Sequence, residues 1–331
     1  MLILEERDLT DTGIDWHSTI AVIEDAVRCL EDNDFSQPVK PYLRYRDLKN
    51  RIIAMPAFVG GNINMAGVKW IASFPGNIKK GIPRAHSVVV LNDADTGEPV
   101  GIINTALLSV IRTASVSGMV IKRFNSKREM NDIRIGITGF GPIGRYHLKM
   151  CQALLGDRIT SIRLFDLQQI DVSGVTEPGK IEVVSTWEEA YTDADIFITC
   201  TVSDAPYIDK RPKPGSLHLN VSLRDYKTSV YEWFKDAIIV DNWEEVCRER
   251  TDIEMLHQEK GLQKENTRSI TDVLHDDCWS QYNAQSPVMF NPMGMAVFDI
   301  AIGNYYYQAA CGKKNVENHP AKQSLYTGIT E

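Results

Sequence analysis

One glycine-rich stretch has the residue types and the spacing that hold a dinucleotide. The run Gly139-Phe140-Gly141-Pro142-Ile143-Gly144 follows a β-branched segment at 133–138 that is typical of a buried parallel strand. It precedes an expected helix at 145–155, and a second strand, expected at 161–165, ends on Asp166. A glycine triplet alone is weak evidence, but strand, glycine turn, helix and strand-ending acid in this order predict a dinucleotide-binding unit.

Each residue of this unit has a definite expected task. Gly139 permits a tight turn, Gly141 lets the backbone approach a pyrophosphate, and Gly144 lets helix and strand pack closely. The start of the helix offers free N–H groups and a positive dipole end to the phosphates. Asp166 can accept hydrogen bonds from both ribose hydroxyls and repels a 2′-phosphate. Because no arginine follows at 167–169, the sequence favours NAD over NADP.

Three cations upstream of the glycine turn could hold the carboxylate of a small anionic substrate. Lys69 lies in an apolar strand between Val68 and Trp70, so the strand period of two places it on the face opposite both neighbours. A lysine on a buried face needs an anionic partner. Arg112 lies on an otherwise apolar helix, where its guanidinium suits a bidentate carboxylate, and Arg44 is the third candidate. A structural ion pair or a snorkelling side chain remains an equal alternative for each of them.

Polar residues that follow three later strands could face the same ligand. In doubly wound sheets the ligand lies beyond the carboxyl ends of the strands. The candidates there are Thr199-Cys200-Thr201, Val221-Ser222-Leu223 and Asp241. They could contact ribose and nicotinamide, or they could cap the segments that follow them, and the sequence leaves both interpretations open.

Composition excludes several classes of function. With 331 residues, 43% hydrophobic content and a net charge of −8, the chain is expected to form two well-filled domains and not to bind nucleic acid. No apolar run reaches the roughly 18 residues of a membrane span and no signal peptide is recognisable, so a cytoplasmic protein is expected. Six scattered cysteines favour reduced thiols. The cluster His275-Asp276-Asp277-Cys278 has metal-ligand residue types, but such close neighbours cannot all face one ion, so no metal site is expected.

The elements that must position these residues form two predicted domains. Because the dinucleotide unit starts near residue 130, another domain is expected at 1–126, to which residues 300–331 return. The NAD-binding Rossmann domain is expected at 127–299. The predicted fold class is therefore α/β, with a doubly wound parallel sheet plus an α+β N-terminal domain.

The N-terminal domain is expected to combine helices with an antiparallel or mixed sheet. Helices are expected at 18–32 and 105–124, and strands at 51–55, 67–72, 86–92 and 100–103. A polar turn that ends on Gly97 connects the last two strands.

The Rossmann domain is expected to contain six parallel strands. They are placed at 133–138, 161–165, 181–184, 195–199, 217–221 and 237–240. The segment 171–179 has no helical period, so the second crossover is expected to be truncated. An apolar helix at 294–310 should return to the first domain, and the polar tail after Lys313 should be loose.

Motifs spread over most of the chain resemble the ornithine cyclodeaminase/μ-crystallin family. The resemblance extends from about Asp34 to Asp299. The motifs that carry it are Met55-Pro56, Gly67-Val68-Lys69, Arg112-Thr113-Ala114-Ser115-Val116-Ser117, the glycine turn and Gly294-Met295-Ala296-Val297-Phe298-Asp299. The resemblance implies an NAD-dependent oxidoreductase that acts on the CH–NH group of an amino acid, and a homodimer built through the N-terminal domain.

The resemblance also implies roles for individual residues. Those implied for substrate binding are Arg44, Met55, Lys69 and Arg112, and Lys69 is in addition our candidate for proton handling. Those implied for the dinucleotide are Thr113, Gly139, Gly141, Pro142, Ile143, Gly144, Asp166, Cys200, Thr201, Val221, Ser222, Leu223, Lys227, Met293 and Gly294.

Longer motifs resemble one branch of the family. They are found at 33–44, 51–56, 198–208 and 291–296. That branch oxidatively hydrolyses N-((2S)-2-amino-2-carboxyethyl)-L-glutamate to 2-oxoglutarate and L-2,3-diaminopropionate, a precursor of siderophores and some peptide antibiotics. The same activity is therefore expected of this chain.

Departures from the family pattern narrow the expected activity. Ornithine cyclodeaminases carry a catalytic aspartate just after strand five and a glutamate before Met-Pro. This chain has Val221-Ser222-Leu223 and Ile52-Ile53-Ala54 at those places, so ring closure of ornithine is not the expected reaction. Other family activities remain as alternatives, namely alanine dehydrogenase, ketimine reductase or ornithine cyclodeaminase, as does a non-catalytic binding protein.

Overall fold

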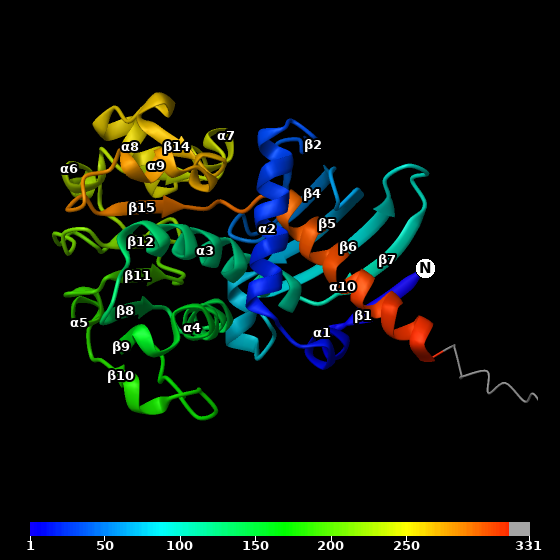
Figure 1. The fold of residues 1–331 in the computed structure, drawn as a ribbon, viewed down its shortest axis with the longest axis horizontal. Helices are drawn as coiled ribbons and strands as arrows, with labels where there is room; N and C mark the ends of the chain where they lie inside the picture. The colour runs from blue at the N-terminus through cyan, green and yellow to red at the C-terminus, as the bar shows by residue number, and fades with distance from the viewer. Residues whose placement is uncertain (318–331) are drawn as a thin grey trace, which may run out of the picture.

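Two β-sheets stand side by side in the computed structural model, which describes residues 1–317 (Figure 1). One sheet is built from residues before 105 and the other from residues after 132. Helix α3 (Leu107–Arg128) leads from the first sheet to the second, and α10 (Ala296–Glu317) leads back. The chain therefore crosses between the two halves at both helices.

The first sheet has seven strands in the order β1-β7-β6-β5-β4-β2, with β3 paired to β4. Its strands are β1 (Leu2–Glu5), β2 (Phe35–Ser36), β3 (Tyr42–Leu43), β4 (Arg51–Val59), β5 (Met65–Ser73), β6 (Ala85–Asp93) and β7 (Pro99–Asn104). All neighbours are antiparallel except β1, which runs parallel to β7. The four predicted strands are confirmed. Strands β1, β2 and β3 were not predicted, because such short runs carry no readable period.

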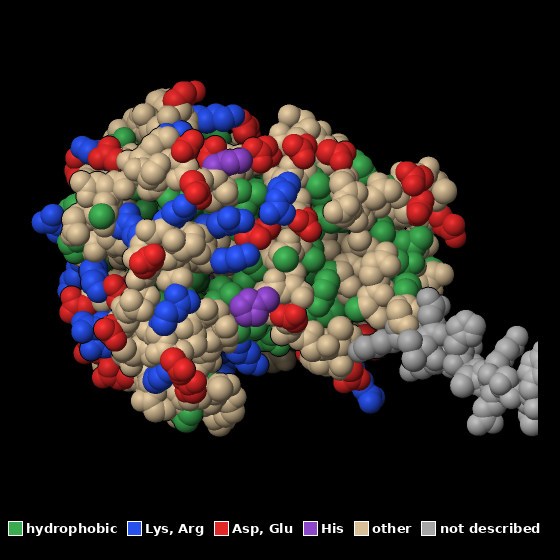
Figure 2. Space-filling view, in the orientation of Figure 1, with side chains coloured by type: hydrophobic (Ala, Val, Ile, Leu, Met, Phe, Trp, Pro, Cys, Tyr) green, Lys and Arg blue, Asp and Glu red, His purple; other side chains and the backbone are tan. Residues whose placement is uncertain are grey.

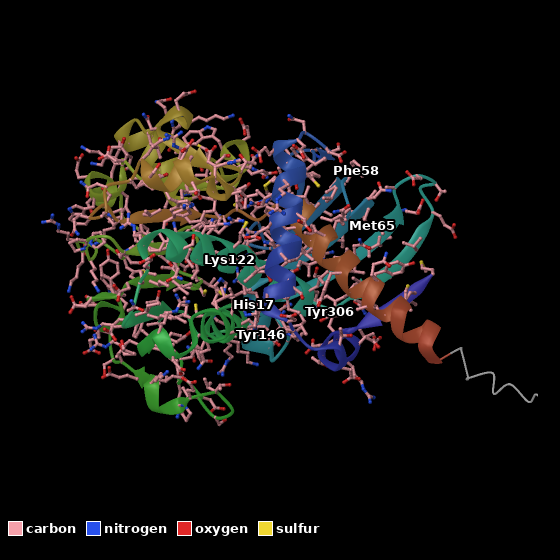
Figure 3. The ribbon with its side chains drawn as sticks, viewed as in Figure 1. His17, Phe58, Met65, Lys122, Tyr146 and Tyr306 are labelled. Atoms are coloured by element: carbon pink, nitrogen blue, oxygen red, sulfur yellow. The ribbon has the colours of Figure 1, made fainter. Side chains whose placement is uncertain are left out.

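Helices cover one face of this sheet. Helix α10 lies against β4, β5 and β6, and α2 (Trp16–Glu31) and α3 pack on α10, while α1 (Glu6–Thr12) follows β1. Tyr306 of α10 is buried there and donates to the carbonyl of Gly13 at 3.2 Å (Figure 3). The predicted helices at 18–32, 105–124 and 294–310 are confirmed, with α10 starting at Ala296.

The second sheet has eight parallel strands in the order β10-β9-β8-β11-β12-β15-β13-β14. They are β8 (Ile133–Thr138), β9 (Ile159–Phe165), β10 (Ile181–Val183), β11 (Ile196–Thr199), β12 (Leu217–Asn220), β13 (Ile238–Val240), β14 (Thr267–Ser269) and β15 (Val288–Asn291). The six predicted strands are confirmed, as is the doubly wound order of the first five. Strands β14 and β15 were not predicted from the sequence. Insertion of β15 beside β12 brings Pro292 and Met293 to the edge where Ser222 lies.

The helices of this half are mostly short. They are α4 (Pro142–Leu155), α5 (Trp187–Tyr191), α6 (Tyr231–Phe234), α7 (Trp243–Val246), α8 (Asp252–Lys260) and α9 (Asp276–Ser280). Short 3₁₀ segments occur at Pro75–Lys80, Gly156–Arg158, Pro178–Lys180, Thr228–Val230, Lys264–Asn266 and Asp272–Leu274. Only the segment Pro178–Lys180 lies between β9 and β10, so the predicted truncated crossover is confirmed.

One apolar cluster extends through both halves. It includes Ile23 and Val89 on the side of the first sheet and Ile135 and Phe290 on the side of the second. The packing of α10 on the first sheet is consistent with the predicted return of residues 300–331, of which 318–331 lie outside the described residues. The boundary between 126 and 127 stays a prediction. No helix within residues 1–317 has the length and apolarity to cross a bilayer.

Candidate active site

The glycine turn has the geometry that its residue types predict. Gly139 adopts a φ of +84°, and its N–H donates to the carbonyl of Phe165 at 2.8 Å. A Cβ on Gly144 would lie 2.1 Å from the carbonyl oxygen of Gly139, so only glycine permits this contact between turn and helix. A Cβ on Gly141 would meet nothing within 4 Å, which leaves the space above that peptide open. Helix α4 begins at Pro142 with no side chain capping it, as a phosphate site requires.

Asp166 faces the glycine turn from the end of β9. Its Oδ2 accepts the Phe140 N–H at 2.6 Å, and its Oδ1 accepts the Gln168 N–H at 2.8 Å. A carboxylate has further lone pairs, so these two bonds leave it able to accept ribose hydroxyls. The backbone bonds fix the carboxylate where the ribose of a dinucleotide on this turn would be expected.

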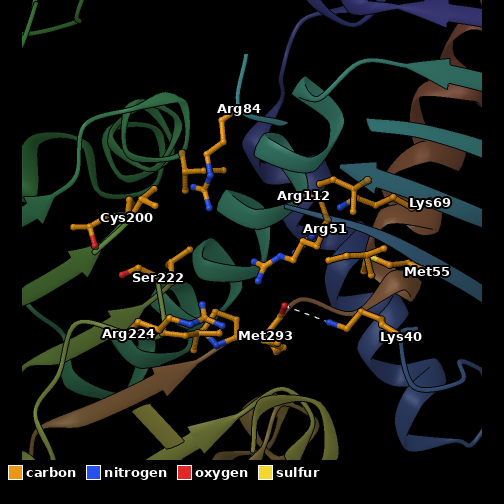
Figure 4. A pocket seen from close by; sticks show the side chains of 18 of the residues that line it. Lys40, Arg51, Met55, Lys69, Arg84, Arg112, Cys200, Ser222, Arg224 and Met293 are labelled. Carbon is orange, nitrogen blue, oxygen red and sulfur yellow. Dashed lines mark hydrogen bonds between the residues drawn. The ribbon is translucent and has the colours of Figure 1, made fainter. Parts of the chain in front are cut away.

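A cavity of about 290 Å³ lies between the two sheets (Figure 4). The lining residues on the N-terminal side are Lys40, Tyr42, Arg51, Ile53, Met55, Lys69, Ile71, Arg84 and Arg112. Those on the Rossmann side are Ile143, Cys200, Thr201, Val202, Val221, Ser222, Leu223, Arg224, Pro292 and Met293. The register of β4 and β5 pairs Met55 with Lys69 and Ile53 with Ile71, so alternate residues of both strands face one space.

The wall of this cavity carries six lysine and arginine side chains, and within residues 1–317 no Asp or Glu lines it. The face of the molecule drawn in Figure 2 differs from the cavity, since Lys and Arg are interspersed there with Asp and Glu. In Figure 4 the labelled arginines reach into the cavity from both sides. A low-dielectric space with one sign of charge attracts anionic ligands.

Lys69 and Arg112 share one buried carboxylate. Lys69 Nζ lies 2.9 Å from Asp299 Oδ1, and Arg112 Nε lies 3.1 Å from the same oxygen. Lys69 is 1% exposed, and burial lowers its pKa to about 8. Asp299 Oδ2 is buried without a hydrogen-bond partner among the described residues. The ion pair explains how both cations are tolerated in the interior, so the structural ion pair that the sequence left open is present, and substrate binding by Lys69 and Arg112 stays a prediction.

Lys40 is a third buried cation of the wall and was missed by the sequence analysis. Its Nζ donates to the carbonyl of Gly294 at 2.7 Å and lies 3.5 Å from that of Met293 and 3.7 Å from Glu245 Oε2. Burial lowers its pKa. Lys40 therefore joins the N-terminal half to the loop after β15.

Three further arginines converge on the cavity without a carboxylate partner. Arg51 opens β4, Arg84 precedes β6 and Arg224 follows β12. The Nε atoms of Arg51 and Arg84 are buried with no hydrogen-bond partner, while Arg224 donates to the carbonyl of Glu249 at 2.9 Å. Burial and the charges of its neighbours lower the pKa of Arg84. In the part of the chain described here, none of the three forms an ion pair, so an anion could bind to all of them.

The cavity gathers most, but not all, of the predicted site residues. Those that line it are Met55, Lys69, Arg112, Ile143, Cys200, Thr201, Val221, Ser222, Leu223 and Met293. Gly139, Gly141, Pro142, Gly144 and Asp166 form the neighbouring turn, and Gly294 borders Arg112, whose Nη1 would lie 2.9 Å from a Cβ at that position.

Three predicted residues do not line the cavity. Arg44 forms an ion pair with Glu249 and donates to the carbonyl of Leu48 at 3.3 Å, and its guanidinium lies 5.3 Å from the ring centroid of Tyr42, which does line the cavity. Lys227 is paired with Asp209 at 2.6 Å. The Thr113 hydroxyl donates to the carbonyl of Ser109 at 2.7 Å.

No group of three or more His, Cys, Asp or Glu side chains that could hold a metal ion occurs in residues 1–317. Within the cluster considered in the sequence, His275 pairs with Glu31 and Asp276 with Lys127. All six cysteines are free thiols.

A Rossmann turn beside a cationic cavity defines the class of protein, a dinucleotide-dependent α/β enzyme. Residues 7–314 match the model of the ornithine cyclodeaminase/mu-crystallin family. The chain belongs to this family, as the sequence motifs predict.

A curated relative and two solved structures are similar to this chain over most of its length. N-((2S)-2-amino-2-carboxyethyl)-L-glutamate dehydrogenase of Staphylococcus aureus is 33% identical over 94% of this chain and 95% of its own length. Among solved structures, Thermococcus litoralis Delta(1)-pyrroline-2-carboxylate reductase, in complex with NADH and L-proline, matches with a TM-score of 0.84 at 22% identity, covering 95% of this chain and 98% of that one. An archaeal alanine dehydrogenase dimer with bound NAD matches with a TM-score of 0.76 at 21% identity, covering 98% and 99%.

Proposed function

We propose that this enzyme oxidises N-((2S)-2-amino-2-carboxyethyl)-L-glutamate at the α-carbon of its glutamyl half and hydrolyses the resulting imine. The products are 2-oxoglutarate and L-2,3-diaminopropionate, a building block for siderophores or peptide antibiotics. The family assignment makes the chain an NAD-dependent oxidoreductase that acts on CH–NH groups. NAD supplies the hydride acceptor, and the residues suited to hold it are the glycine turn, the start of α4 and Asp166.

The surplus of positive charge in the cavity is the observation that carries this proposal. The substrate has three carboxylates, whereas alanine, proline and ornithine have one. Lys69 and Arg112 share Asp299, and Arg51, Arg84 and Arg224 form no ion pair in the described part of the chain. Arg51, Arg84 and Arg224 are only partly buried, but like charges gathered in one cavity repel each other, so a cavity with this many cations suits a ligand with several carboxylates. One carboxylate of the substrate fits Lys69 and Arg112, and the arginine group of Arg51, Arg84 and Arg224 fits the distal carboxylate of the glutamyl half.

Lys69 is the group we assign to proton handling. A secondary amine must lose its ammonium proton before a hydride can leave its α-carbon. With a pKa lowered to about 8, the Lys69 amine is partly neutral near neutral pH and can accept that proton. Its Nζ is held by Asp299 in the cavity wall, beside Met55 and Arg112. Fixed cations also keep the α-carbon in place for transfer of the hydride.

The face of the N-terminal sheet away from α10 supports a homodimer. Among residues 1–317, the helix that packs closely on β4, β5 and β6 is α10, on the opposite face, and the face away from it is apolar. Its residues include Ala54, Pro56, Phe58, Val68, Trp70, Val88, Val90 and Ile102, and Trp70 is 43% exposed. An apolar sheet face of this extent is typical of an interface. We propose that a second copy of the chain covers it, as the dimer of the archaeal alanine dehydrogenase suggests.

The test is NADH formation, followed by absorbance, with four amines offered in turn. The proposal predicts turnover with N-((2S)-2-amino-2-carboxyethyl)-L-glutamate, together with release of 2-oxoglutarate, and none with alanine or proline. Ornithine should give neither NADH nor proline. Turnover of alanine or of cyclic imines instead would assign one of the alternative family activities. Tight NAD binding without any turnover would indicate a binding protein.

A further inference from the structure

The Rossmann wall of the cavity carries two hydroxyls that are tied to one buried carboxylate. Thr201 Oγ1 donates to Asp225 Oδ1 at 2.6 Å, and Ser222 Oγ donates to Asp225 Oδ2. Thr201 and Ser222 line the cavity, whereas Asp225 is completely buried behind them. Asp225 therefore reaches the cavity only through these two hydroxyls.

Each of these hydroxyls faces the cavity as a hydrogen-bond acceptor. A hydroxyl has one proton, so a hydroxyl that donates to Asp225 can only accept from a ligand. Ser222 Oγ also lies 2.7 Å from Thr199 Oγ1, and the Thr199 hydroxyl donates to Asn220 Oδ1 at 3.2 Å, so this hydroxyl chain continues away from the cavity. The charged side chains of the wall are all donors. Thr201 and Ser222 are thus well suited to hold a ligand that must give up a proton, such as a water molecule.

The surroundings of Asp225 favour uptake of a proton. Burial raises the pKa of its carboxyl group, against the hydrogen bonds from Ser222 and Thr201. Asp225 forms no ion pair among the described residues, and its own N–H donates to Asp252 Oδ2 at 3.1 Å. Burial also raises the pKa of Asp252, to about 7. The other titratable groups that face Asp225 are Arg224, Cys200, Tyr207 and Tyr226.

We propose that Asp225 accepts, through the Ser222 hydroxyl, the proton of the water that hydrolyses the imine. The Thr201 hydroxyl helps to bind that water. This role of Asp225 rests on the proposed function, which creates the imine in its protonated form, because hydride loss from the neutral secondary amine leaves the N–H proton on nitrogen. The water oxygen adds to the carbon of the C=N bond, whose π pair moves to nitrogen. One water proton passes to Ser222 Oγ as the Ser222 proton passes to Asp225. The hydroxyl proton of the carbinolamine and the proton on Asp225 then both reach the nitrogen. The C–N bond breaks with its pair on nitrogen, which leaves as a primary ammonium, and Asp225 is a carboxylate again.

Asp225 is a positioning residue in this scheme, because it touches the water only through Ser222. Its role is specific to the second half of the reaction. Hydride transfer needs no water, so a variant that cannot take the proton should complete the first half and stall in the second.

In the experiment, the Asp225→Asn variant is mixed rapidly with N-((2S)-2-amino-2-carboxyethyl)-L-glutamate and NAD, and NADH formation is followed by absorbance. Samples quenched at successive times are assayed for 2-oxoglutarate. We expect the first NADH to form within about threefold of the wild-type rate, while steady-state turnover falls about 100-fold or more. A burst of one NADH per subunit should therefore appear. The fall of wild-type kcat at low pH that protonation of Asp225 causes should be absent from this variant, whereas the inflection in kcat/KM that Lys69 sets should remain.

Two further variants keep the test decisive. Asp252→Asn changes the neighbouring buried carboxylate and serves as the control for structural damage. This variant should slow the first NADH and the steady-state turnover alike, and it should show no burst. If Asp225→Asn does not fold, the double variant Thr201→Val/Ser222→Ala removes the hydroxyl path. Because both residues line the cavity, it is assayed at saturating NAD, and steady-state turnover should fall at least tenfold more than the rate of the first NADH.

Two results would overturn the assignment of Asp225. One is steady-state turnover at the wild-type level, and the other is equal slowing of the first NADH and of turnover. If the wild-type enzyme forms no NADH, the proposed function itself is wrong. Failure of the proposed function can therefore be told apart from failure of the role assigned to Asp225.

Discussion

The dinucleotide site and the cationic cavity beside it differ in how far apart their residues lie in the sequence. The dinucleotide site depends on a single unit from Ile133 to Asp166, in which strand, turn, helix and strand follow without interruption and of which Ile143 borders the cavity. The cationic wall draws Lys40, Arg51, Lys69, Arg84, Arg112 and Arg224 from separate segments and from both sheets. A local motif can be read because its geometry follows from consecutive residues. A converging set of charges becomes visible only when strand register and topology place its members together.

The largest expected effect concerns the carboxylate that makes the cationic wall possible. Asp299→Asn leaves Lys69 and Arg112 buried without their shared counter-charge, so the free energy of unfolding should fall by about 3–5 kcal/mol. Urea denaturation measures this change. Asp11→Asn, which removes an exposed ion pair with Arg7, is the control and should have no measurable effect. Equal stability of the two variants would mean that the cationic wall does not depend on Asp299.

The second prediction compares Arg84, an arginine that the structure places in the cavity wall, with Arg44, which the sequence predicted to bind the substrate. Arg84→Met should lower kcat/KM for N-((2S)-2-amino-2-carboxyethyl)-L-glutamate about 30- to 100-fold, the equivalent of about 2–3 kcal/mol for a charged hydrogen bond. The dissociation constant of NAD should not change. Arg44→Met is the matched control and should stay close to wild type, because Arg44 pairs with Glu249 outside the cavity. The reverse ranking of the two variants would restore the role that the sequence predicted for Arg44.

The third prediction concerns NAD binding at the glycine turn alone. Gly141→Ala adds a methyl group where the protein has open space, so the melting temperature should stay near that of wild type. NAD affinity should fall about tenfold or more, because the pyrophosphate must approach this peptide closely. Isothermal titration with NAD measures the loss. Gly179→Ala, also in open space but away from the turn, should bind NAD normally. Normal affinity in Gly141→Ala would place the phosphates elsewhere.

The smallest effect is the pH dependence set by Lys69. Only its neutral form can accept a proton, and burial lowers its pKa to about 8. Below that pH, kcat/KM should therefore rise about tenfold per unit of pH, and it should level off above it. The profile of Lys69→Met should lack this inflection, which separates Lys69 from the amine of the substrate. Retention of the inflection, or of near-normal turnover at saturating substrate, would leave Lys69 a binding role only.

Local motifs could be predicted from the sequence, whereas contacts between distant segments could not. The glycine turn, Asp166 and the six main strands of the Rossmann sheet were predictable, because each rests on a local pattern. Strand β15 was not, since Val288–Asn291 is short and runs directly into Pro292. The face of Lys69 followed from the strand period, but its partner Asp299 lies 230 residues away. Arg51, Arg84 and Arg224 stand in ordinary strand-end and loop positions, where nothing in the local sequence distinguishes them from solvated surface charges.

The most direct test of the account compares two substrates that differ in one group. N-((2S)-2-amino-2-carboxyethyl)-L-glutamine replaces the distal carboxylate of the glutamyl half by an amide of the same shape. If the arginine group of Arg51, Arg84 and Arg224 selects the distal carboxylate, kcat/KM should be about 30-fold or more lower for the amide, and Arg84→Met should remove most of that preference. Equal kcat/KM for the two substrates with the wild-type enzyme would contradict the account.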